Sequence, residues 1–469
     1  MSDRIETLVV GAGISGLTTA YALQKSGVAV RVVEACPRPG GVIQSVKRDG
    51  YLLECGPQSF SGNGHITALC KDLGILEDRV LADPKAPRYV LIDGKLQAVP
   101  MGPGIIASSF MGGGTRSAIL RDVLGSSASP EPDESVAAFI RRKFSDRLLE
   151  RLVGPFVSGI YAGDPEKLSL RAAFPILYDA EKASGSVIRG IFKVMKQRGA
   201  ARAADPKQPP REKPTLQTLR DGNETIIRAM AARLGDSLTC GTEIVRVQSL
   251  NTSQEPQAPR FGVTVRGPKG EEVIETERLI LSIPTATAGN VLDSLDPGFS
   301  QQLSGINYPG VAVVSLGYAK QDVNDPLTGF GFLVPRSSGL SILGTVWNSS
   351  LFPGRAPEGQ ALLTSFVGGA TNPGALSKTP EALAAQVHRE LTPLLGLAKE
   401  PVFSNVTLWP RAIPQYNLGH TGRLAAVEAL RASFPGLYFS GNYLNGPAIG
   451  TCVEQALKVA DQVRISFAN

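Results

Sequence analysis

The sequence is poor in the residues that usually build metal sites and disulfide frameworks. Three histidines occur among 469 residues, and the five cysteines are odd in number, lie far apart and form no Cys-x-x-Cys pair. We therefore expect no metal site and no disulfide framework, which favours a reducing compartment. We also expect none of His65, His388 and His420 to be an essential acid or base. His388 lies in a predicted helix at 382–395 and is expected at the surface.

Long apolar segments are also absent. No uninterrupted apolar run reaches the roughly 18 residues that cross a bilayer, and a first strand near Glu6 leaves no room for a signal peptide. The 48 basic and 42 acidic residues give a net charge of +6 and are mostly interspersed, so no nucleic-acid partner is expected. We expect a cytoplasmic protein, at most peripheral on the inner face of the cell membrane, with an anionic ligand or membrane surface as partner.

The first 35 residues predict one βαβ unit, with a strand at 7–10, a helix to about Lys25 and a strand at 28–33. Continuous valine and leucine in such strands is typical of a parallel sheet covered by helices on both faces. Residues 135–152 predict an amphipathic helix whose apolar side packs into a core. Residues 196–214 are highly charged and predict a mobile linker.

The second half of the chain is predicted to be rich in strands that alternate with turns. Strands are expected at 241–247, 261–265, 278–283, 311–318 and 436–440, and a final helix at 451–463.

A G-x-G-x-x-G motif joins the first strand to the first helix. Gly11 makes the tight turn, Gly13 admits a pyrophosphate and Gly16 lets helix and sheet touch. The helix N-terminus then faces the phosphates with its partial positive charge. Glu34 ends the second strand, where its carboxylate can accept hydrogen bonds from ribose hydroxyls. A dinucleotide site is therefore predicted here, and the other residues expected beside it are Ala12, Ile14, Ser15 and Ala35.

NAD and FAD both use this motif, and the next segments favour FAD. Arg38-Pro39-Gly40-Gly41 directly follows Glu34, and here the chain resembles the glutathione-reductase-like flavoproteins of the amine oxidase and desaturase type. In that group a second glycine turn passes the pyrophosphate, a loop such as residues 54–59 lies beside the isoalloxazine, and residues 441–451 match a C-terminal flavin motif. The resemblance implies cofactor contacts at Arg38, Gly40, Gly41, Val42, Gly56, Pro57, Gln58, Ser59, Ile244, Trp409, Gly441, Asn442, Pro447, Ala448 and Ile449.

The FAD is expected to bind without a covalent link, because the Ser-Gly-Gly-Cys segment of covalent amine oxidases is missing. Only one dinucleotide motif occurs in the chain. Flavoproteins that NADPH reduces usually need a second one, so electrons are expected to pass to oxygen or a quinone.

Individual segments resemble the protoporphyrinogen oxidase family over nearly the full chain. The matching segments are GGVIQSV, ECGP, EPDESV, GIYAGDPEKLS, FGFLVP and IPQYNLGH. The resemblance implies an α/β fold with a Rossmann-like FAD domain of the glutathione-reductase type, a mixed-sheet substrate domain and a helical, membrane-associated domain. The implied boundaries are 1–83, 214–292 and 410–469 for the FAD domain, 84–98 and 293–409 for the substrate domain, and 99–213 for the helical domain.

The activity that the resemblance implies is oxidation of protoporphyrinogen IX to protoporphyrin IX, with oxygen becoming hydrogen peroxide. Arg88 would pair with a substrate propionate, and the chamber would be formed by Gly159, Phe330, Phe332, Leu333 and Phe366. Flavin N5 would accept the hydride, so no catalytic side chain is implied. Gln58 departs from the family, because some members carry arginine there, and it is given no role based on charge.

Three alternatives remain open at this point. The uncharged residues 101–114 either contact a membrane through Ile105, Ile106, Phe110 and Met111 or form a buried loop over the active site. The chain could instead be another amine-oxidase-type flavoenzyme for an amine or polyene, or a flavin- or porphyrin-binding carrier without turnover. The resemblance is also compatible with a homodimer.

Overall fold

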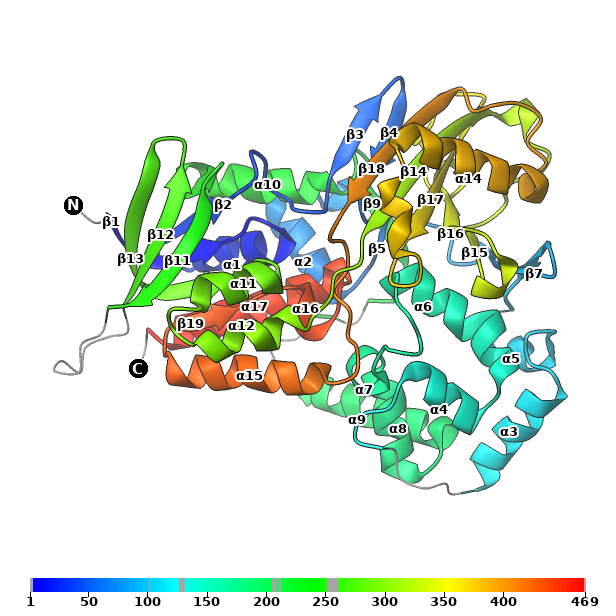
Figure 1. The fold of residues 1–469 in the computed structure, drawn as a ribbon, viewed down its shortest axis with the longest axis horizontal. Coiled ribbons are helices and arrows are strands. Elements are labelled where there is room, and N and C mark those ends of the chain that lie inside the picture. The colour runs from blue at the N-terminus through cyan, green and yellow to red at the C-terminus, as the bar shows by residue number, and fades with distance from the viewer. Residues whose placement is uncertain are drawn as a thin grey trace.

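The computed structural model describes residues 3–100, 102–125, 131–204, 209–210, 212–250 and 260–467. Two seven-stranded sheets lie side by side along the long axis of the molecule, and a group of helices lies beneath the second sheet (Figure 1). The chain passes between these parts several times. The result is an α/β fold with mixed sheets, as predicted.

The first sheet draws its strands from three separate segments of the chain. Its order is β10-β2-β1-β13-β12-β11, with β19 beside β13. The strands are β1 (Asp3–Val10), β2 (Val30–Glu34), β10 (Leu238–Cys240), β11 (Glu243–Ser249), β12 (Phe261–Gly267), β13 (Gly270–Leu281) and β19 (Leu437–Phe439). β10, β2, β1, β13 and β19 are parallel, while β11, β12 and β13 form an antiparallel ribbon.

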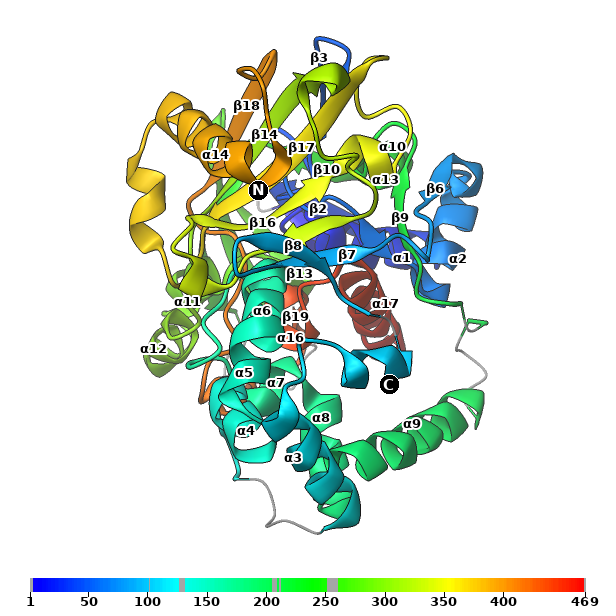
Figure 2. The ribbon, with the colours of Figure 1, turned by 90° about the vertical axis from the view of Figure 1, so that its right-hand side faces the viewer.

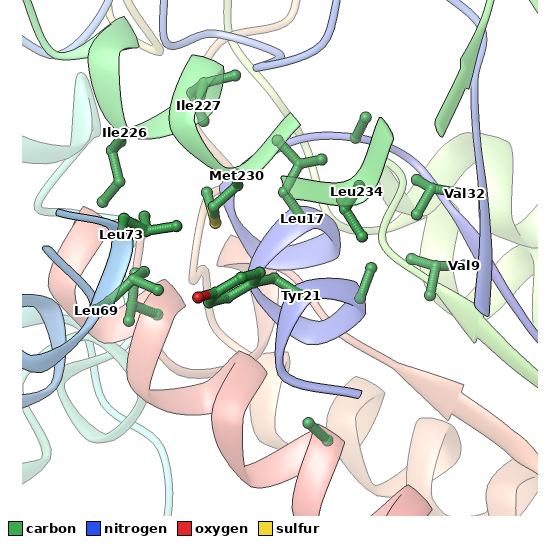
Figure 3. Packing of buried hydrophobic residues seen from close by; sticks show 14 of the residues in the cluster. Val9, Leu17, Tyr21, Val32, Leu69, Leu73, Ile226, Ile227, Met230 and Leu234 are labelled. Atoms are coloured by element: carbon green, nitrogen blue, oxygen red, sulfur yellow. The ribbon is translucent and has the colours of Figure 1, made fainter. Parts of the chain in front are cut away.

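Helices cover both faces of this sheet because its strands are apolar on both sides. Val9 packs into one core, whereas Leu8 and Val10 pack into the other. Figure 3 shows the first core, where side chains of three helices meet Val9 and Val32. That core involves α1 (Ile14–Lys25), α2 (Gly64–Leu73), α10 (Glu224–Leu234) and α17 (Ile449–Ile465), and the second involves α11 (Thr285–Leu292), α12 (Pro297–Ser304) and α15 (His420–Ser433). The predicted βαβ unit is confirmed.

The second sheet has the order β18-β14-β17-β16-β15-β7-β8. It is antiparallel except between β15 and β7. Its strands are β7 (Arg88–Ile92), β8 (Lys95–Ala98), β14 (Val311–Ala319), β15 (Gly331–Leu333), β16 (Ile342–Trp347), β17 (Gln360–Gly368) and β18 (Phe403–Trp409). Helix α14 (Pro380–Leu395) covers one face, and α6 (Gly154–Tyr161) packs against β15 and β16 (Figure 2).

Short strands and helices connect the two sheets. β3 (Ser45–Arg48) pairs with β4 (Tyr51–Glu54), and β9 (Leu216–Leu219) lies between β5 (Phe60–Ser61) and β6 (Arg79–Leu81). Two short helices complete this region, α13 (Asn348–Leu351) and α16 (Asn442–Asn445).

The helical group corrects two expectations. The predicted helix at 135–152 is broken at Phe144, where Ser145 caps a new helix, although its apolar residues do pack into a common core. Helix α9 (Val187–Ala204) also runs through the first half of the predicted linker, so residues 196–204 are not a loop. The rest of that linker falls partly outside the described residues. The remaining helices are α3 (Gly113–Leu124), α4 (Val136–Lys143), α5 (Asp146–Leu148), α7 (Leu170–Ala173), α8 (Pro175–Ser184) and α9 (Val187–Ala204).

Residues 101–114, for which a membrane contact and a buried loop were both left open, are mostly exposed, and within the described residues of this segment only Phe110 and Met111 are buried. Phe110 packs with Val90 and Ile92, and Met111 joins the core of the helical group, so for these two side chains the structure favours the buried alternative. Ile106 is exposed, and Met101 lies outside the described residues. Within the described part of the chain, no helix is both long and apolar enough to span a bilayer.

Candidate active site

The three motif glycines differ in what surrounds them. A Cβ on Gly11 would lie 2.3 Å from the Ser282 carbonyl oxygen, and one on Gly16 would lie 1.9 Å from the Gly11 carbonyl oxygen. Gly11 also has a φ of +99°, which favours glycine. Within the part of the chain that the structure describes, no atom other than those of Gly13 and its two chain neighbours lies within 4 Å of a Cβ built on Gly13. Gly11 and Gly16 are therefore required for packing, whereas Gly13 borders open space that a pyrophosphate can fill.

Glu34 lies directly over this turn. Its Oε2 accepts a 2.7 Å hydrogen bond from the Ala12 amide, and its Oε1 accepts a 2.9 Å bond from the Cys36 amide. Each carboxylate oxygen can accept a second bond, so the group retains capacity for ribose hydroxyls. Ser15 is buried in the first turn of α1, Ile14 is half-buried and Ala35 is exposed.

The second glycine turn packs against the first. The Gly40 amide donates to the Ala12 carbonyl at 2.7 Å, and a Cβ on Gly41 would lie 3.7 Å from the Gly13 Cα. Arg38 braces this turn, since its guanidinium donates to the Gly41 carbonyl at 2.8 Å. The two turns thus form one continuous backbone surface beside the open side of Gly13.

This surface continues into the loop after β4. A Cβ on Gly56 would lie 2.0 Å from the Val42 carbonyl oxygen, so Gly56 permits a close approach of the two segments. Trp409, at the end of β18, donates from its indole to the Cys55 carbonyl at 2.6 Å. Pro57 and Ser59 are half-buried, while Gln58 is buried.

The C-terminal motif lies at the same end of the first sheet. β19 is parallel to β13, and the chain turns at Gly441 and Gly446 before α17 begins beside α1. Ile449 is buried at the start of α17, after Ala448 at the N-cap. The N-termini of α1 and α17 therefore lie near each other at this edge (Figure 1), close to Asn442 and Pro447. Ile244 lies in β11, two residues after Thr242, whose amide donates to the Glu34 carbonyl at 2.8 Å, and its side chain packs into the second core.

Arg88 and Phe330 come together, although 242 positions separate them in the sequence. The guanidinium carbon of Arg88 lies 5.7 Å from the centre of the Phe330 ring, a cation–π arrangement. Both residues line a cavity of about 110 Å³ that Leu216 and Leu351 also border. Asp83 is the acidic residue of this lining.

Gly159 and Leu333 form a second pair. A Cβ on Gly159 would lie 2.4 Å from Cδ2 of Leu333, so glycine lets α6 approach β15 closely. Phe366 is half-buried and, like Phe330, packs against Val346 and its apolar neighbours. Phe332 points to the opposite face of the sheet and packs in the core beneath α14. The structure therefore does not bring Phe332 together with the other predicted chamber residues.

Two of the histidines are buried, His420 more completely than His388. His420 donates from Nε2 to the Tyr443 carbonyl at 3.0 Å and stacks on Tyr416, and its burial lowers its pKa to about 4. His388 was wrongly expected at the surface. It is buried because α14 lays it against the second sheet, where its Nδ1 lies 3.1 Å from the Tyr318 hydroxyl. His65 is half-buried on α2.

Three polar residues near the site were not predicted from the sequence. Glu54 and Arg355 form a buried ion pair, and Asn223 contacts the loop at residues 54–58 from the start of α10. Arg355 and Asn223 belong to no local motif, and their partners lie far away in the sequence. In the sequence, only the position of Glu54 directly before Cys55-Gly56-Pro57 could have indicated that a charged residue lies at this site.

Taken together, the sheet, the glycine turns and the paired helix N-termini define a dinucleotide-binding fold with a second sheet beside it. The chain belongs to the family of flavin-containing amine oxidoreductases, whose model matches residues 14–464, and within it to the protoporphyrinogen oxidases and their relatives. The protein is therefore an FAD-dependent oxidase, as predicted. The open side of Gly13 and the free acceptor capacity of Glu34 fit this cofactor.

The relatives cover nearly the whole chain. It is 37% identical to the chloroplastic protoporphyrinogen oxidase of Nicotiana tabacum over 98% of this chain and 85% of that protein. It is 30% identical to the coproporphyrinogen III oxidase of Bacillus subtilis (strain 168) over the full length of both. A solved structure of a protein from Exiguobacterium sp. 255-15 shares the fold, with a TM-score of 0.78, 24% identity and 99% of both chains covered.

Proposed function

We propose that this protein oxidises protoporphyrinogen IX to protoporphyrin IX in haem biosynthesis, with FAD as hydride acceptor and oxygen as the final oxidant. The identity of 37% to a protoporphyrinogen oxidase over 98% of this chain carries this proposal. The reaction removes six electrons from the porphyrinogen. One porphyrinogen and three oxygen molecules are consumed, and one porphyrin and three molecules of hydrogen peroxide are formed. The flavin supplies the hydride chemistry when bound, and this chain binds and orients the macrocycle.

The pair of Arg88 and Phe330 supports the placement of a propionate. A cavity of about 110 Å³ is well below the several hundred Å³ that a whole ligand of this size needs, so it suits one arm of the macrocycle. The ring of Phe330 holds the guanidinium where a carboxylate can meet it. The neighbouring pair of Gly159 and Leu333, together with Phe366, would offer apolar surface to the macrocycle.

The balance of charges in the cavity supports protoporphyrinogen over coproporphyrinogen. Arg88 is the basic residue of the lining, and Asp83 would repel an additional carboxylate. Coproporphyrinogen carries more propionates than protoporphyrinogen, so it would gain less from this cavity. A comparison of kcat/KM for the two porphyrinogens tests the choice, and a preference for coproporphyrinogen would contradict it.

An anaerobic reduction experiment tests the oxidase function itself. The purified yellow protein should bleach when protoporphyrinogen IX is added without oxygen and recover its colour in air. A carrier without turnover would keep its colour. An enzyme for amines or polyenes would bleach only with those compounds.

A peripheral membrane contact is proposed for the helical group. Leu124 on α3 and Phe192 on α9 are each 74% exposed, and α3 packs against α9. Arg121 and Lys196 are exposed on the same two helices. Apolar side chains beside cations suit a surface of anionic lipids.

A further inference from the structure

The loop between β4 and β5 is held through its own carbonyl groups. The Gln58 amide donates from Nε2 to the Glu54 carbonyl at 2.8 Å and to the Gly56 carbonyl at 2.9 Å. The Oε1 atom of Gln58 accepts a 2.7 Å bond from Asn348. Both ends of the Gln58 side-chain amide therefore form hydrogen bonds that hold this loop in shape. This role needs a neutral amide and no charge.

Two further side chains hold the carbonyls that Gln58 does not bind. Trp409 donates to the Cys55 carbonyl at 2.6 Å, and Asn223 donates from Nδ2 to the Pro57 carbonyl at 2.9 Å. Four consecutive carbonyl oxygens, from residue 54 to residue 57, thus accept hydrogen bonds from side-chain N–H groups.

These bonds also fix the direction of the intervening amides. In a trans peptide the N–H group points away from the carbonyl of the preceding residue, and the described residues contain no cis peptide bond. The Gly56 N–H therefore points away from Trp409, and the Gln58 N–H points away from Asn223. Among the residues that the structure describes, neither N–H finds a hydrogen-bond acceptor. Gln58 is buried and Gly56 is half-buried. Backbone donors that are shielded from water are almost always paired, so these two N–H groups are available to a ligand.

The position of the loop identifies that ligand. The backbone surface that starts at Gly13 passes through Gly41 and Val42 and reaches Gly56 by direct contact. A flavin whose pyrophosphate lies at Gly13 would extend its ring along this surface toward the loop. The ring carries carbonyl oxygens and nitrogens that accept hydrogen bonds.

We propose that the N–H groups of Gly56 and Gln58 donate to the acceptor edge of the flavin ring, and that Asn223 and Trp409 are positioning residues that aim them. Reduction places more negative charge on this edge, and hydrogen bonds to a charged acceptor are stronger. The two donors should therefore bind reduced flavin more tightly than oxidised flavin and raise its midpoint potential. This inference depends on FAD and not on the identity of the porphyrinogen.

Asn223→Asp tests the proposal with little change in shape. The aspartate keeps an oxygen for the Thr218 hydroxyl, which donates to Asn223 Oδ1 at 2.9 Å, but it offers no donor to the Pro57 carbonyl. We expect affinity for reduced FAD to fall about three- to tenfold, the value of one hydrogen bond, and affinity for oxidised FAD to fall less. A redox titration of the holoprotein against a reference dye, with no porphyrinogen present, should then show a lower midpoint potential.

Two companion variants complete the experiment. Trp409→Phe removes the indole donor, keeps an aromatic ring and adds no charge. It should shift the potential in the same direction, and it decides the question if Asn223→Asp does not fold. Asn324→Asp makes the same change at an exposed residue and should leave the potential unchanged. Unchanged potentials in Asn223→Asp and Trp409→Phe would overturn the proposal, even if both variants bound FAD more weakly, because Asn223 and Trp409 would then have only a structural role.

Discussion

Arg355 lies 2.8 Å from the carboxylate of Glu54, 301 positions earlier in the chain, and each side chain is only 2% exposed. Arg355 also donates to the Thr218 hydroxyl and to the Leu219 carbonyl. The guanidinium therefore ties the second sheet to β4 and β9. Burial raises the pKa of Glu54, while the positive charge of Arg355 acts in the opposite direction.

Arg355→Met should lower the free energy of unfolding by about 3–5 kcal/mol, because it leaves the buried Glu54 carboxylate without its counter-charge. Urea denaturation of the holoprotein measures this loss. Arg141→Met is the matched control, since Arg141 forms an ion pair with Glu166 that is well exposed to solvent. It should cost less than about 1 kcal/mol. Equal losses in the two variants would show that the buried pair of Glu54 and Arg355 contributes no more to the free energy of unfolding than an exposed pair does.

Gly13→Val should abolish flavin binding, because its side chain would fill the open space reserved for the pyrophosphate. The ratio of flavin to protein absorbance after purification measures the effect. Gly422→Val serves as the control, since Gly422 on α15 also has open space around its Cβ position. A Gly13→Val protein that purified with a full complement of flavin would contradict the placement of the cofactor.

The comparison of sequence and structure separates local features from distant ones. The turn at Gly11–Gly16 was predictable because strand, turn and helix are adjacent in the sequence and each glycine has its own steric reason. The pair of Arg355 and Glu54 was not, because no local pattern records a contact across 301 positions. His388 was misplaced because a single helix does not reveal which of its mixed faces a distant sheet will cover.

The same distinction applies to the substrate chamber. Arg88 and Phe330 were proposed from a resemblance, and the structure places them at one cavity. Phe332 was proposed with them, but alternation along β15 sends it to the other face of the sheet from Leu333. Prediction of its direction required the strand register, which the sequence alone did not provide.

Arg88→Ala should raise the KM for protoporphyrinogen about ten- to a hundredfold, because a charge-assisted bond to a propionate contributes roughly 1.5–3 kcal/mol. The flavin content should not change. Lys85→Ala removes a neighbouring exposed cation and should leave the KM close to that of the parent. If Arg88→Ala also left the KM unaltered, the propionate would have to bind elsewhere.

A double variant, Leu124→Glu with Phe192→Glu, should weaken binding to vesicles that contain an anionic lipid. Each side chain can contribute up to roughly 1.5–3 kcal/mol when it is fully buried in an apolar phase, so we expect at least a tenfold loss. Co-sedimentation measures the bound fraction. Val402→Glu places the same charge at an exposed apolar residue just before β18 and should bind as the parent does. No difference between the double variant and the parent would exclude α3 and α9 as the contact surface.

His420→Gln should change the pH dependence of stability and leave catalysis nearly intact. Burial lowers the pKa of His420 from 6.5 to about 4, so between these values the unfolded chain takes up a proton that the folded protein does not. Its contribution to stability is therefore complete above pH 6.5 and is lost as the pH falls toward 4. At 1.36 kcal/mol per pKa unit the loss amounts to about 3 kcal/mol.

The difference in unfolding free energy between the parent and His420→Gln isolates this effect from the carboxylates that titrate in both proteins. That difference should shrink by about 3 kcal/mol between pH 7.5 and pH 4. The glutamine amide can still donate to the Tyr443 carbonyl, so turnover at neutral pH should stay within a few-fold of the parent. A general base would be worth about a hundred- to ten-thousandfold. A loss of that size with intact flavin content would show that His420 takes part in proton transfer. Parallel pH curves would show that folding does not lower the pKa of His420.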